Sequence, residues 1–272
     1  MVWSDHYQKQ VNRNMGLLTE KDQEILRKAC VAVCGLGGLG GVVVENLARL
    51  GVESFVLVDH GTFEPTNSNR QIYSFTDTNG RLKTEVTEEF LRRINPAIRT
   101  RKYLTMTDQN IGEVLEGVDA VALSIDDIRA IVTLSRAARA KKIPLIEGWA
   151  VAYGNVRVFT ADTPTLEEVY ALPTIGRAVA SISDQESREL ILHSLRQLQG
   201  VEGLAEYYPP PTVERLMQKG EGTTLAPMVW LTCVLMANEI FKVLTGWGSL
   251  ALAPNFRFYD PMEGRIPGAV KK

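Results

Sequence analysis

Residues 30–59 combine a short apolar run, a glycine-rich turn and a second apolar run that ends in an acid. The turn reads Gly-Leu-Gly-Gly-Leu-Gly, with its glycines at Gly35, Gly37, Gly38 and Gly40. Glycines between a strand and a helix allow the backbone to approach a phosphate, and the helix N-terminus offers unpaired N–H groups to that anion. Asp59 follows Gly40 by nineteen positions, where a carboxylate can accept hydrogen bonds from ribose hydroxyls. The segment therefore predicts a nucleotide-binding unit, and a glycine turn without a ligand is its structural alternative.

Helical and extended segments alternate after this unit. The helix that follows the glycines is expected to end at Gly51, and further helices are expected from about Arg81 to Asn95 and from Ile128 to Lys141. Apolar runs at 120–123 and 143–146 flank the last of these helices. This alternation predicts an α/β, Rossmann-like fold, in which helices cover both faces of a mostly parallel central sheet.

The pattern changes after residue 160. Residues 161–224 are polar, with one expected helix from Ser183 to Gln199 and a break at three consecutive prolines. A long helix then runs to Leu244, before Gly246, and residues 256–259 are expected to form a strand that returns to the sheet. We expect one domain with four parts: an N-terminal arm (1–29), a nucleotide-binding core (30–160), a helical insertion (161–224) and a return helix and strand (225–272).

The composition favours a globular protein of a reducing, cytoplasmic compartment. A chain of 272 residues with 45% hydrophobic content can bury a large core, and a net charge of −2 gives no general attraction for nucleic acid. The three cysteines form neither a disulfide framework nor a CxxC metal pair, and the first residues do not resemble a secretory signal. The apolar stretch 225–244 carries Asn238, Glu239 and Lys242, which favours a core helix over a membrane span.

Charged residues after Asp59 favour a triphosphate over a dinucleotide. A triphosphate with its metal adds negative charge that needs dedicated cations, and Arg70 and Lys83 could supply them. Asp126 follows the apolar run 120–123, at the carboxyl edge of the sheet where ligands collect, and a carboxylate there could hold Mg²⁺. Asp126 and Asp127 could instead cap the helix that begins near Ile128, and Arg70 could be a surface ion-pair partner. The P-loop pattern is absent.

The order of these motifs resembles the ThiF/MoeB superfamily of ATP-dependent activating enzymes, which includes the ubiquitin-activating enzymes. The match runs over residues 31–160 and consists of the glycine turn, Asp59, Asn67-x-x-Arg70-Gln71, Lys83 and Asp126. The resemblance implies an adenylyltransferase that uses ATP to activate a carboxylate and releases pyrophosphate. It also implies the site roles, with Asp59 on the ribose, Asp126 on Mg²⁺, and the phosphates bound by Asn67, Arg70, Gln71 and Lys83.

The resemblance also implies partners. The carboxylate would typically be the C-terminal glycine of a small ubiquitin-like sulfur carrier, and a peptide terminus or a metabolite acid is the alternative. Residues 13–18 resemble the N-terminal arm of ThiF-type proteins, and Arg13 matches an arginine that such homodimers extend into the neighbouring site. We therefore expect a two-fold homodimer, with neither a membrane nor nucleic acid as a partner.

The absence of certain sequence motifs narrows the reaction that this sequence predicts. Two CxxC pairs that hold structural zinc in some relatives are absent, so no zinc is expected. No cysteine lies in 161–224, and Cys233 on the apolar helix is expected to be a packed thiol, so the reaction should stop at the acyl adenylate without an enzyme thioester. A carboxylate is already ionised at neutral pH, so its attack on the α-phosphate requires no general base and no histidine.

Three rival functions remain open at this point. The glycine turn and Asp59 alone are compatible with an NAD(P)-dependent oxidoreductase. A relative of the tRNA threonylcarbamoyladenosine dehydratases would activate a carboxylate on a modified nucleoside, although the charge balance argues against it. A protein that binds nucleotide without turnover is the third. Asp127 stands where relatives often carry Asn, which leaves open whether Asp126 or Asp127 holds the metal.

Overall fold

A seven-stranded sheet forms the centre of the molecule in the computed structural model, which describes residues 3–198, 203–212, 215 and 222–266. The strand order is β3-β2-β1-β4-β5-β6-β7. Strands β1 to β5 run parallel, β6 pairs antiparallel with β5, and β7 pairs antiparallel with β6. The bounds are β1 Cys30–Cys34, β2 Ser54–Val58, β3 Arg99–Tyr103, β4 Ala120–Leu123, β5 Leu145–Glu147, β6 Gly154–Phe159 and β7 Arg257–Tyr259. The expected return strand is therefore present.

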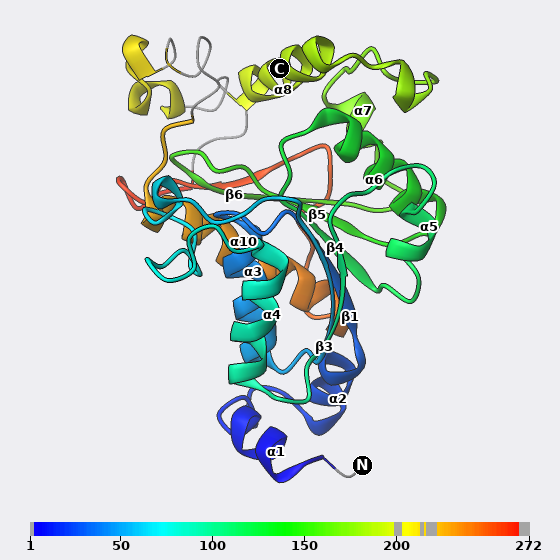
Figure 1. Cartoon of the computed structure of the whole chain (residues 1–272), viewed down its shortest axis with the longest axis vertical. Helices are drawn as coiled ribbons and strands as arrows, with labels where there is room; N and C mark the ends of the chain where they lie inside the picture. The colour runs from blue at the N-terminus through cyan, green and yellow to red at the C-terminus, as the bar shows by residue number, and fades with distance from the viewer. Residues whose placement is uncertain (1–2, 199–202, 213–214, 216–221, 267–272) are drawn as a thin grey trace.

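Helices cover both faces of this sheet (Figure 1). One face is covered by α2 (Glu20–Lys28), α3 (Gly40–Leu50), α4 (Lys83–Ile94) and α10 (Ala226–Thr245). The other is covered by α5 (Ile111–Val114), α6 (Ile128–Ala140), α7 (Leu166–Val169) and α8 (Asp184–Leu198). The α1 helix (Asp5–Val11) and the 3-10 turns η1 (Pro65–Asn67), η2 (Val179–Ser181) and η3 (Leu204–Tyr207) complete the elements. The Rossmann-like fold with a helical insertion is thus confirmed.

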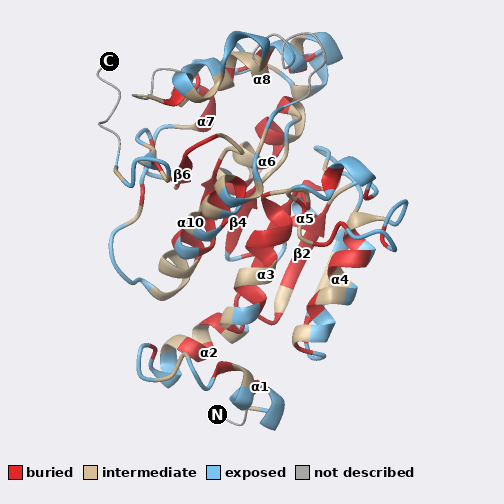
Figure 2. Cartoon of the chain, turned by 90° about the vertical axis from the view of Figure 1, so that its left-hand side faces the viewer, coloured by how far each residue is buried: buried red, intermediate tan, exposed pale blue. Residues whose placement is uncertain are grey.

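The inner strands consist of unbroken runs of apolar residues because both of their faces are buried. In β1, Val31 and Val33 point into the core beneath α3 and α10, whereas Ala32 and Cys34 point into the core beneath α6. Figure 2 shows the sheet and α3 as the most completely buried part of the molecule. This double burial fixes the strand positions from which the loops at the carboxyl edge project.

Local sequence signals set the ends of the helices. The α3 helix ends at Gly51 with φ +103°, and α10 ends at Gly246 with φ +76°, both left-handed conformations that favour glycine. Asp127 caps α6 by accepting hydrogen bonds from the N–H groups of Arg129 and Ala130. The α4 helix begins at Lys83, two residues later than the sequence predicts, because residues 81–82 pair with the loop after β2.

Two parts of the fold were not predicted as a strand or as helices from the pattern of apolar residues. The edge strand β3 is Arg-Thr-Arg-Lys-Tyr, and charged side chains are what an exposed sheet edge carries. The N-terminal arm folds into α1 and α2, which pack at the C-terminal end of α3, where the Tyr7 hydroxyl donates to the Gly51 carbonyl at 2.8 Å. In both cartoon views this arm and α8 lie at opposite ends of the molecule (Figures 1 and 2).

The α10 helix is long and apolar enough to cross a membrane. It packs instead along α3 and β6, with Val229, Cys233 and Met236 fully buried. A core helix of a globular protein passes the same test of length and hydropathy. The packing therefore agrees with the expected core helix.

Candidate nucleotide site

The glycine turn lies at the point where the strand order of the sheet reverses. Strand β1 has β2 on one side and β4 on the other, and ligands of open α/β sheets bind in the crevice at such a point. The Gly35 N–H donates to the Val58 carbonyl at 2.8 Å, and Gly35 adopts φ +90°. A Cβ added to Gly35 would lie 2.2 Å from the Ser124 carbonyl oxygen, so no other residue fits there. A Cβ on Gly40 would lie 1.8 Å from the Gly35 oxygen.

Asp59 holds this turn in place. Its Oδ2 accepts from the Leu36 N–H at 2.7 Å, and its Oδ1 accepts from the Gly61 N–H at 2.7 Å. An ionised carboxylate has about four acceptor positions, so hydroxyl donors can still be bound. The half-buried Asp59 thus joins the ends of β1 and β2 and keeps acceptor capacity toward the crevice.

Lys83 lies next to Asp59 without forming an ion pair. A Cβ added to Gly61 would lie 3.1 Å from Asp59 Oδ1 and 3.3 Å from Lys83 Nζ, so both groups meet at Gly61. Within the described part of the chain, Lys83 makes no hydrogen bond or salt bridge through its side chain. A cation in the first turn of a helix is unfavourable unless an anion faces it. The position therefore favours an anionic ligand.

The loop between β2 and α4 carries Asn67, Arg70 and Gln71, and it brings the Arg70 and Gln71 side chains to the glycine turn. Asn67 is buried, and its Oδ1 accepts from the Glu64 N–H at 3.2 Å. A Cβ on Gly38 would lie 3.3 Å from Arg70 Cγ, and one on Gly37 would lie 3.7 Å from Gln71 Nε2. These contacts place Arg70 and Gln71 directly on the turn.

Two buried polar atoms beside the turn have no hydrogen-bond partner among the residues that the structure describes. They are Oε1 of Gln71 and Oγ of Ser124, the residue that contacts Gly35. Buried polar groups are almost always hydrogen-bonded, so each such atom needs an explanation. A polar ligand or ordered water in the crevice would satisfy both, which supports a binding site here.

The Arg70 guanidinium contacts its own loop. Its Nη1 donates to the Thr66 carbonyl at 3.1 Å and to Asn69 Oδ1 at 2.7 Å, and the Trp230 indole N–H donates to the Arg70 carbonyl at 2.9 Å. Trp230 lies in the first part of α10. Arg70 therefore has to turn its side chain to reach a ligand, although its backbone is already fixed.

Asp126 and Asp127 differ in their surroundings. The Oδ1 of Asp127 accepts from Arg129 N–H at 2.8 Å and Ala130 N–H at 3.1 Å, and its Oδ2 contacts the Arg129 guanidinium at 3.2 Å. Burial alone would raise the pKa of Asp127, but these hydrogen bonds hold it below its usual value. Asp126 is exposed and makes no bond within the described residues. Of the two carboxylates, Asp126 is the one free to bind a cation.

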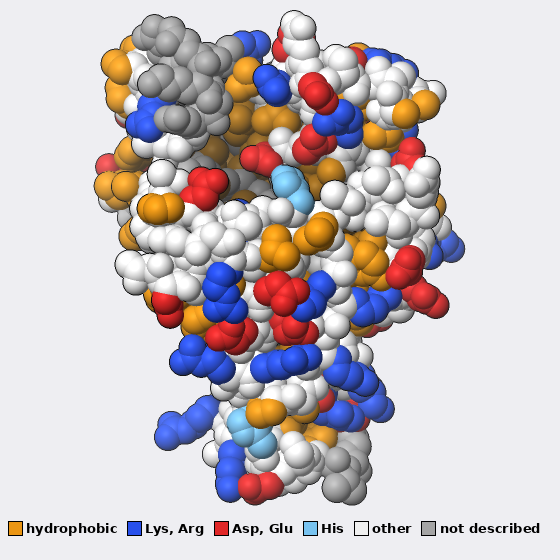
Figure 3. Space-filling model, in the orientation of Figure 1, with side chains coloured by type: hydrophobic (Ala, Val, Ile, Leu, Met, Phe, Trp, Pro, Cys, Tyr) orange, Lys and Arg blue, Asp and Glu red, His pale blue; other side chains and the backbone are white. Residues whose placement is uncertain are grey.

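A cavity of about 270 Å³ adjoins Asp126. It lies between the turn from β4 to α6 and the helix α8 of the insertion, and its lining consists of Asp126, Asp127, Arg129, Asp184, Ser187 and Arg188. Figure 3 shows this face hollowed above the N-terminal end of α3, with acidic side chains and a histidine at the rim. The lining residues from α8, which are Asp184, Ser187 and Arg188, could not be identified from the sequence, because only the folded insertion brings them to Asp126.

The carboxylates of this site fit a magnesium ion that is held mainly by the phosphates of a bound nucleotide. Among the described residues there is no group of three or more His, Cys, Asp or Glu side chains that could hold a metal. Mg²⁺ is commonly held by one or two carboxylates together with substrate phosphates and water. A single free carboxylate at Asp126 agrees with that pattern.

Arg13 is not part of this crevice within one chain. It is exposed in the turn after α1, and the neighbouring Asn14 donates to the Leu50 carbonyl at the C-terminal end of α3. The glycine turn lies at the other end of that eleven-residue helix, about 16 Å away. Arg13 could reach a site only on another molecule.

Two of the three cysteines are fully enclosed, and Cys30 is partly buried. Cys34 and Cys233 are fully buried, and Cys233 Sγ contacts the Val229 carbonyl at 3.0 Å. Burial raises the pKa of the Cys34 thiol to about 12 and also raises the pKa of Cys233. Thiols of this kind are poor nucleophiles, which agrees with a packed Cys233.

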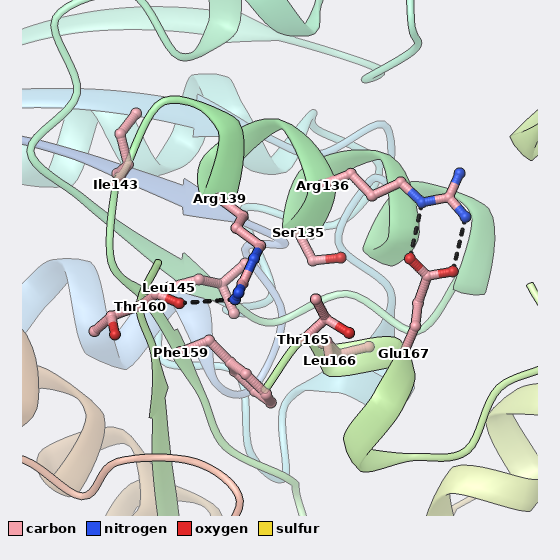
Figure 4. Close-up of a pocket in the computed structure, with 10 residues that line it drawn as sticks. All are labelled: Ser135, Arg136, Arg139, Ile143, Leu145, Phe159, Thr160, Thr165, Leu166 and Glu167. Carbon is pink, nitrogen blue, oxygen red and sulfur yellow. Dashed lines mark hydrogen bonds and ion pairs between the residues drawn. The ribbon is translucent and has the colours of Figure 1, made fainter. Parts of the chain in front are cut away.

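A second cavity lies between α6 and α7, and it is a packing space and not a ligand site (Figure 4). Its volume is about 40 Å³. Arg136 forms two hydrogen bonds with Glu167, at 2.8 and 2.7 Å, and Arg139 donates to the Thr160 and Thr163 carbonyls. Every cation at this cavity already has a partner.

The chain is similar to known proteins along most of its length. The model of the ThiF family matches residues 7–271. The chain is 33% identical to a molybdopterin-synthase adenylyltransferase of Escherichia coli, over 88% of this chain and 82% of that protein. It is 31% identical to a sulfur carrier protein adenylyltransferase of Thermus thermophilus, over 97% of this chain and 87% of the relative.

A third relative is named for a different activity. The tRNA threonylcarbamoyladenosine dehydratase of Escherichia coli is 33% identical over 54% of this chain, and the chain spans only 55% of its length. The solved structure of that bacterium's dehydratase TcdA matches with TM-score 0.67 and 22% identity, over 90% of this chain and 98% of the other. PaaA matches with TM-score 0.70 and 18% identity, over the whole chain and 76% of PaaA. These structures share the fold.

Proposed function

Because the chain belongs to the ThiF family, we propose that it is an adenylyltransferase that uses ATP to activate a carboxylate. The observation that carries the proposal is that two charges around the glycine turn, Lys83 and Asp126, have no partner in the part of the chain that the structure describes. A dinucleotide needs little beyond a helix N-terminus for its pyrophosphate, whereas a triphosphate needs further cations. Two relatives of nearly full coverage, both named adenylyltransferases, support the same reaction.

In the proposed reaction, a carboxylate oxygen attacks the α-phosphorus of ATP. The bond from the α-phosphorus to the bridging oxygen breaks, and pyrophosphate leaves with the electron pair. Lys83 and Arg70 offset the charge of the phosphates, and Asp59 accepts from the ribose hydroxyls. Asn67 and Gln71 align the phosphates on the turn. A Mg²⁺ ion held by Asp126 would supply further charge neutralisation when bound.

The proposed substrate is the C-terminal glycine of a small ubiquitin-like or sulfur-carrier protein. The relative from Thermus thermophilus is named a sulfur carrier protein adenylyltransferase, which supports this class, and a peptide or metabolite acid is the alternative. The product stays an acyl adenylate, because Cys34 and Cys233 are buried and Cys30 lies within β1. The three free thiols agree with a cytoplasmic location.

A homodimer is part of the proposal. Arg13 is exposed, lies far from its own glycine turn and would be available to the crevice of a second copy. The apolar side chains of Leu17 and Trp247 are also exposed, 77% and 42% respectively. Sedimentation of the purified chain should give the mass of two copies, and a monomer at all concentrations would exclude this arrangement.

A dehydratase acting on tRNA is the second candidate. It is favoured by the 33% identity to tRNA threonylcarbamoyladenosine dehydratase, which extends over about half of each chain. Both candidates begin with ATP and a carboxylate, so they differ in the acid and not in the nucleotide site.

Pyrophosphate exchange into ATP tests both candidates. The purified chain is incubated with Mg²⁺, ATP, labelled pyrophosphate and one acid: a Gly-Gly-terminated sulfur carrier, the same carrier without its last glycine, or tRNA bearing threonylcarbamoyladenosine. We expect label in ATP only with the intact carrier. Exchange with the tRNA alone would favour the dehydratase, and no exchange with any acid would contradict adenylation.

A further inference from the structure

The insertion helix α8 is fixed over the turn that carries Asp126. Its Ser187 hydroxyl, which is buried, accepts from the Ile128 N–H at the start of α6 at 3.2 Å. Leu190 is buried in the core beneath α6. The Arg129 guanidinium contacts Asp184, the first residue of α8, at 2.7 Å. The helix is therefore anchored by a hydrogen bond, an ion pair and apolar packing, and its side chains have defined positions relative to Asp126.

Arg188 is an unpaired cation in this setting. It lines the same cavity as Asp126, and within the described part of the chain its side chain makes no hydrogen bond or salt bridge. Asp184, one turn earlier on the helix, would be its usual ion-pair partner. That carboxylate is instead engaged by Arg129, which also contacts Asp127. Arg188 consequently faces the cavity with its charge uncompensated.

The charge of the cavity changes sign when a divalent cation binds. Its three carboxylates, Asp126, Asp127 and Asp184, outnumber its two guanidinium groups by one. A divalent ion at Asp126 would make the cavity net positive, and phosphate oxygens that accompany the ion would then meet Arg188. A planar guanidinium binds such oxygens in pairs and more strongly than a neutral donor does.

We propose that Arg188 is a phosphate-binding residue of the site and contacts the part of ATP that leaves as pyrophosphate. The inference rests on the proposed function and extends it to the insertion. Lys83 and Arg70 approach the glycine turn from the loop and helix that follow β2, whereas Arg188 approaches from the side of β4. The triphosphate is thus held by cations on two sides, and the insertion supplies one of them. Charge accumulates on the leaving pyrophosphate, where a positioned cation assists the reaction.

Isothermal titration calorimetry on the full chain tests this assignment with three probes: ATP with Mg²⁺, pyrophosphate with Mg²⁺, and AMP. The variants are Arg188→Gln, Arg188→Lys and the matched control Arg196→Gln, which removes the same charge from the last turn of the same helix. We expect Arg188→Gln to weaken the binding of ATP and of pyrophosphate about ten- to hundredfold, which is the effect expected when a hydrogen bond to a charged group is lost. This variant should bind AMP with the same affinity as the natural chain does. Arg188→Lys should give an intermediate loss, and Arg196→Gln none.

Two results would overturn the assignment. One is unchanged binding of ATP and pyrophosphate to Arg188→Gln. The other is an equal loss of AMP affinity, which would indicate a structural role for Arg188; thermal melting of each variant checks the fold independently. If the natural chain binds ATP with Mg²⁺ and only the Arg188 effect is absent, the inference alone fails. If the natural chain does not bind ATP, the proposed function fails with it.

Discussion

Charged groups at two places along the carboxyl edge of the sheet differ in burial and in whether they form ion pairs. Between β5 and β6, Glu147 and Arg157 are each 3% exposed and form an ion pair at 2.7 Å. Arg157 also lies over the rings of Phe159, Tyr170 and Phe256, at 4.9, 4.8 and 3.9 Å. At the glycine turn, by contrast, Lys83 and Asp126 have no partner within the described residues. The charges that hold the fold are paired in the core, whereas the charges that we propose for the ligand have no partner among the described residues.

The paired side also connects the insertion to the sheet. The Tyr170 hydroxyl donates to Glu147 at 2.9 Å and accepts from the Trp149 indole N–H at 2.7 Å. Burial and the neighbouring Glu147 hold the pKa of Tyr170 well above its usual value, so its hydroxyl stays a donor. A network of this kind stabilises only while every member is satisfied.

Removal of one member of the buried pair should have the largest effect on the protein. Glu147→Ala leaves the Arg157 charge buried and uncompensated, so we expect the free energy of unfolding to fall by about 3–5 kcal/mol. Urea denaturation measures this. The control is Glu89→Ala, whose partner Arg81 lies at 2.7 Å in an exposed pair, and which should cost less than about 1 kcal/mol. Equal losses in the two variants would contradict the structural role that we assign to the buried pair.

The open side should respond in activity and not in stability. Asp126→Asn removes the carboxylate available to Mg²⁺, so we expect pyrophosphate exchange to fall about a hundredfold to a thousandfold, with thermal melting unchanged. Asp162→Asn, at another exposed aspartate in the turn after β6, is the matched control and should behave as the natural chain. Full exchange activity in Asp126→Asn would show that another group holds the metal.

Lys83 should affect nucleotide binding less severely. Lys83→Gln keeps most of the side chain but loses the charge beside Asp59, so we expect ATP with Mg²⁺ to bind about ten- to hundredfold more weakly. AMP, which has one phosphate, should lose less. Lys21→Gln on α2 provides an exposed control. Calorimetry that gives the same loss for ATP and AMP would indicate that Lys83 acts only through Asp59.

The smallest effect is expected at Cys233. Cys233→Ser can keep the hydrogen bond to the Val229 carbonyl, and we expect a loss of about 1–2 kcal/mol in stability and no change in exchange activity. Activity is measured at a temperature where the variant is folded. A folded variant without exchange activity would contradict the interpretation of Cys233 as a packed thiol with no role in adenylation.

The sequence predicts those parts of the molecule whose signal is local. The α6 and α10 helices show apolar periodicity with a capping aspartate or a terminal glycine, and the glycine turn with Asp59 has a fixed spacing, so each could be placed in advance. Strand β3 could not be predicted, because it is a charged edge strand that pairs only with β2. The preference for Asp126 over Asp127 depends on which carboxylate turns back to cap α6.

The cavity residues could not be predicted for a different reason. The contact between Ile128 and Ser187 joins segments 59 residues apart, and no motif in 161–224 marks α8 as part of a site. Arg188 becomes a candidate only because Arg129 occupies its neighbour Asp184, which is a property of the packed structure. The roles of the individual site residues stay predictions until they are tested by substitution.

Competition between ATP and NAD⁺ tests the central claim most directly. Titration of the natural chain and of the double variant Lys83→Gln, Asp126→Asn compares the two nucleotides in the presence of Mg²⁺. We predict that the natural chain binds ATP more tightly than NAD⁺, and that the double variant loses most of this preference. Tighter binding of NAD⁺ that is unaffected by the two substitutions would contradict it, since the open charges would then serve no triphosphate.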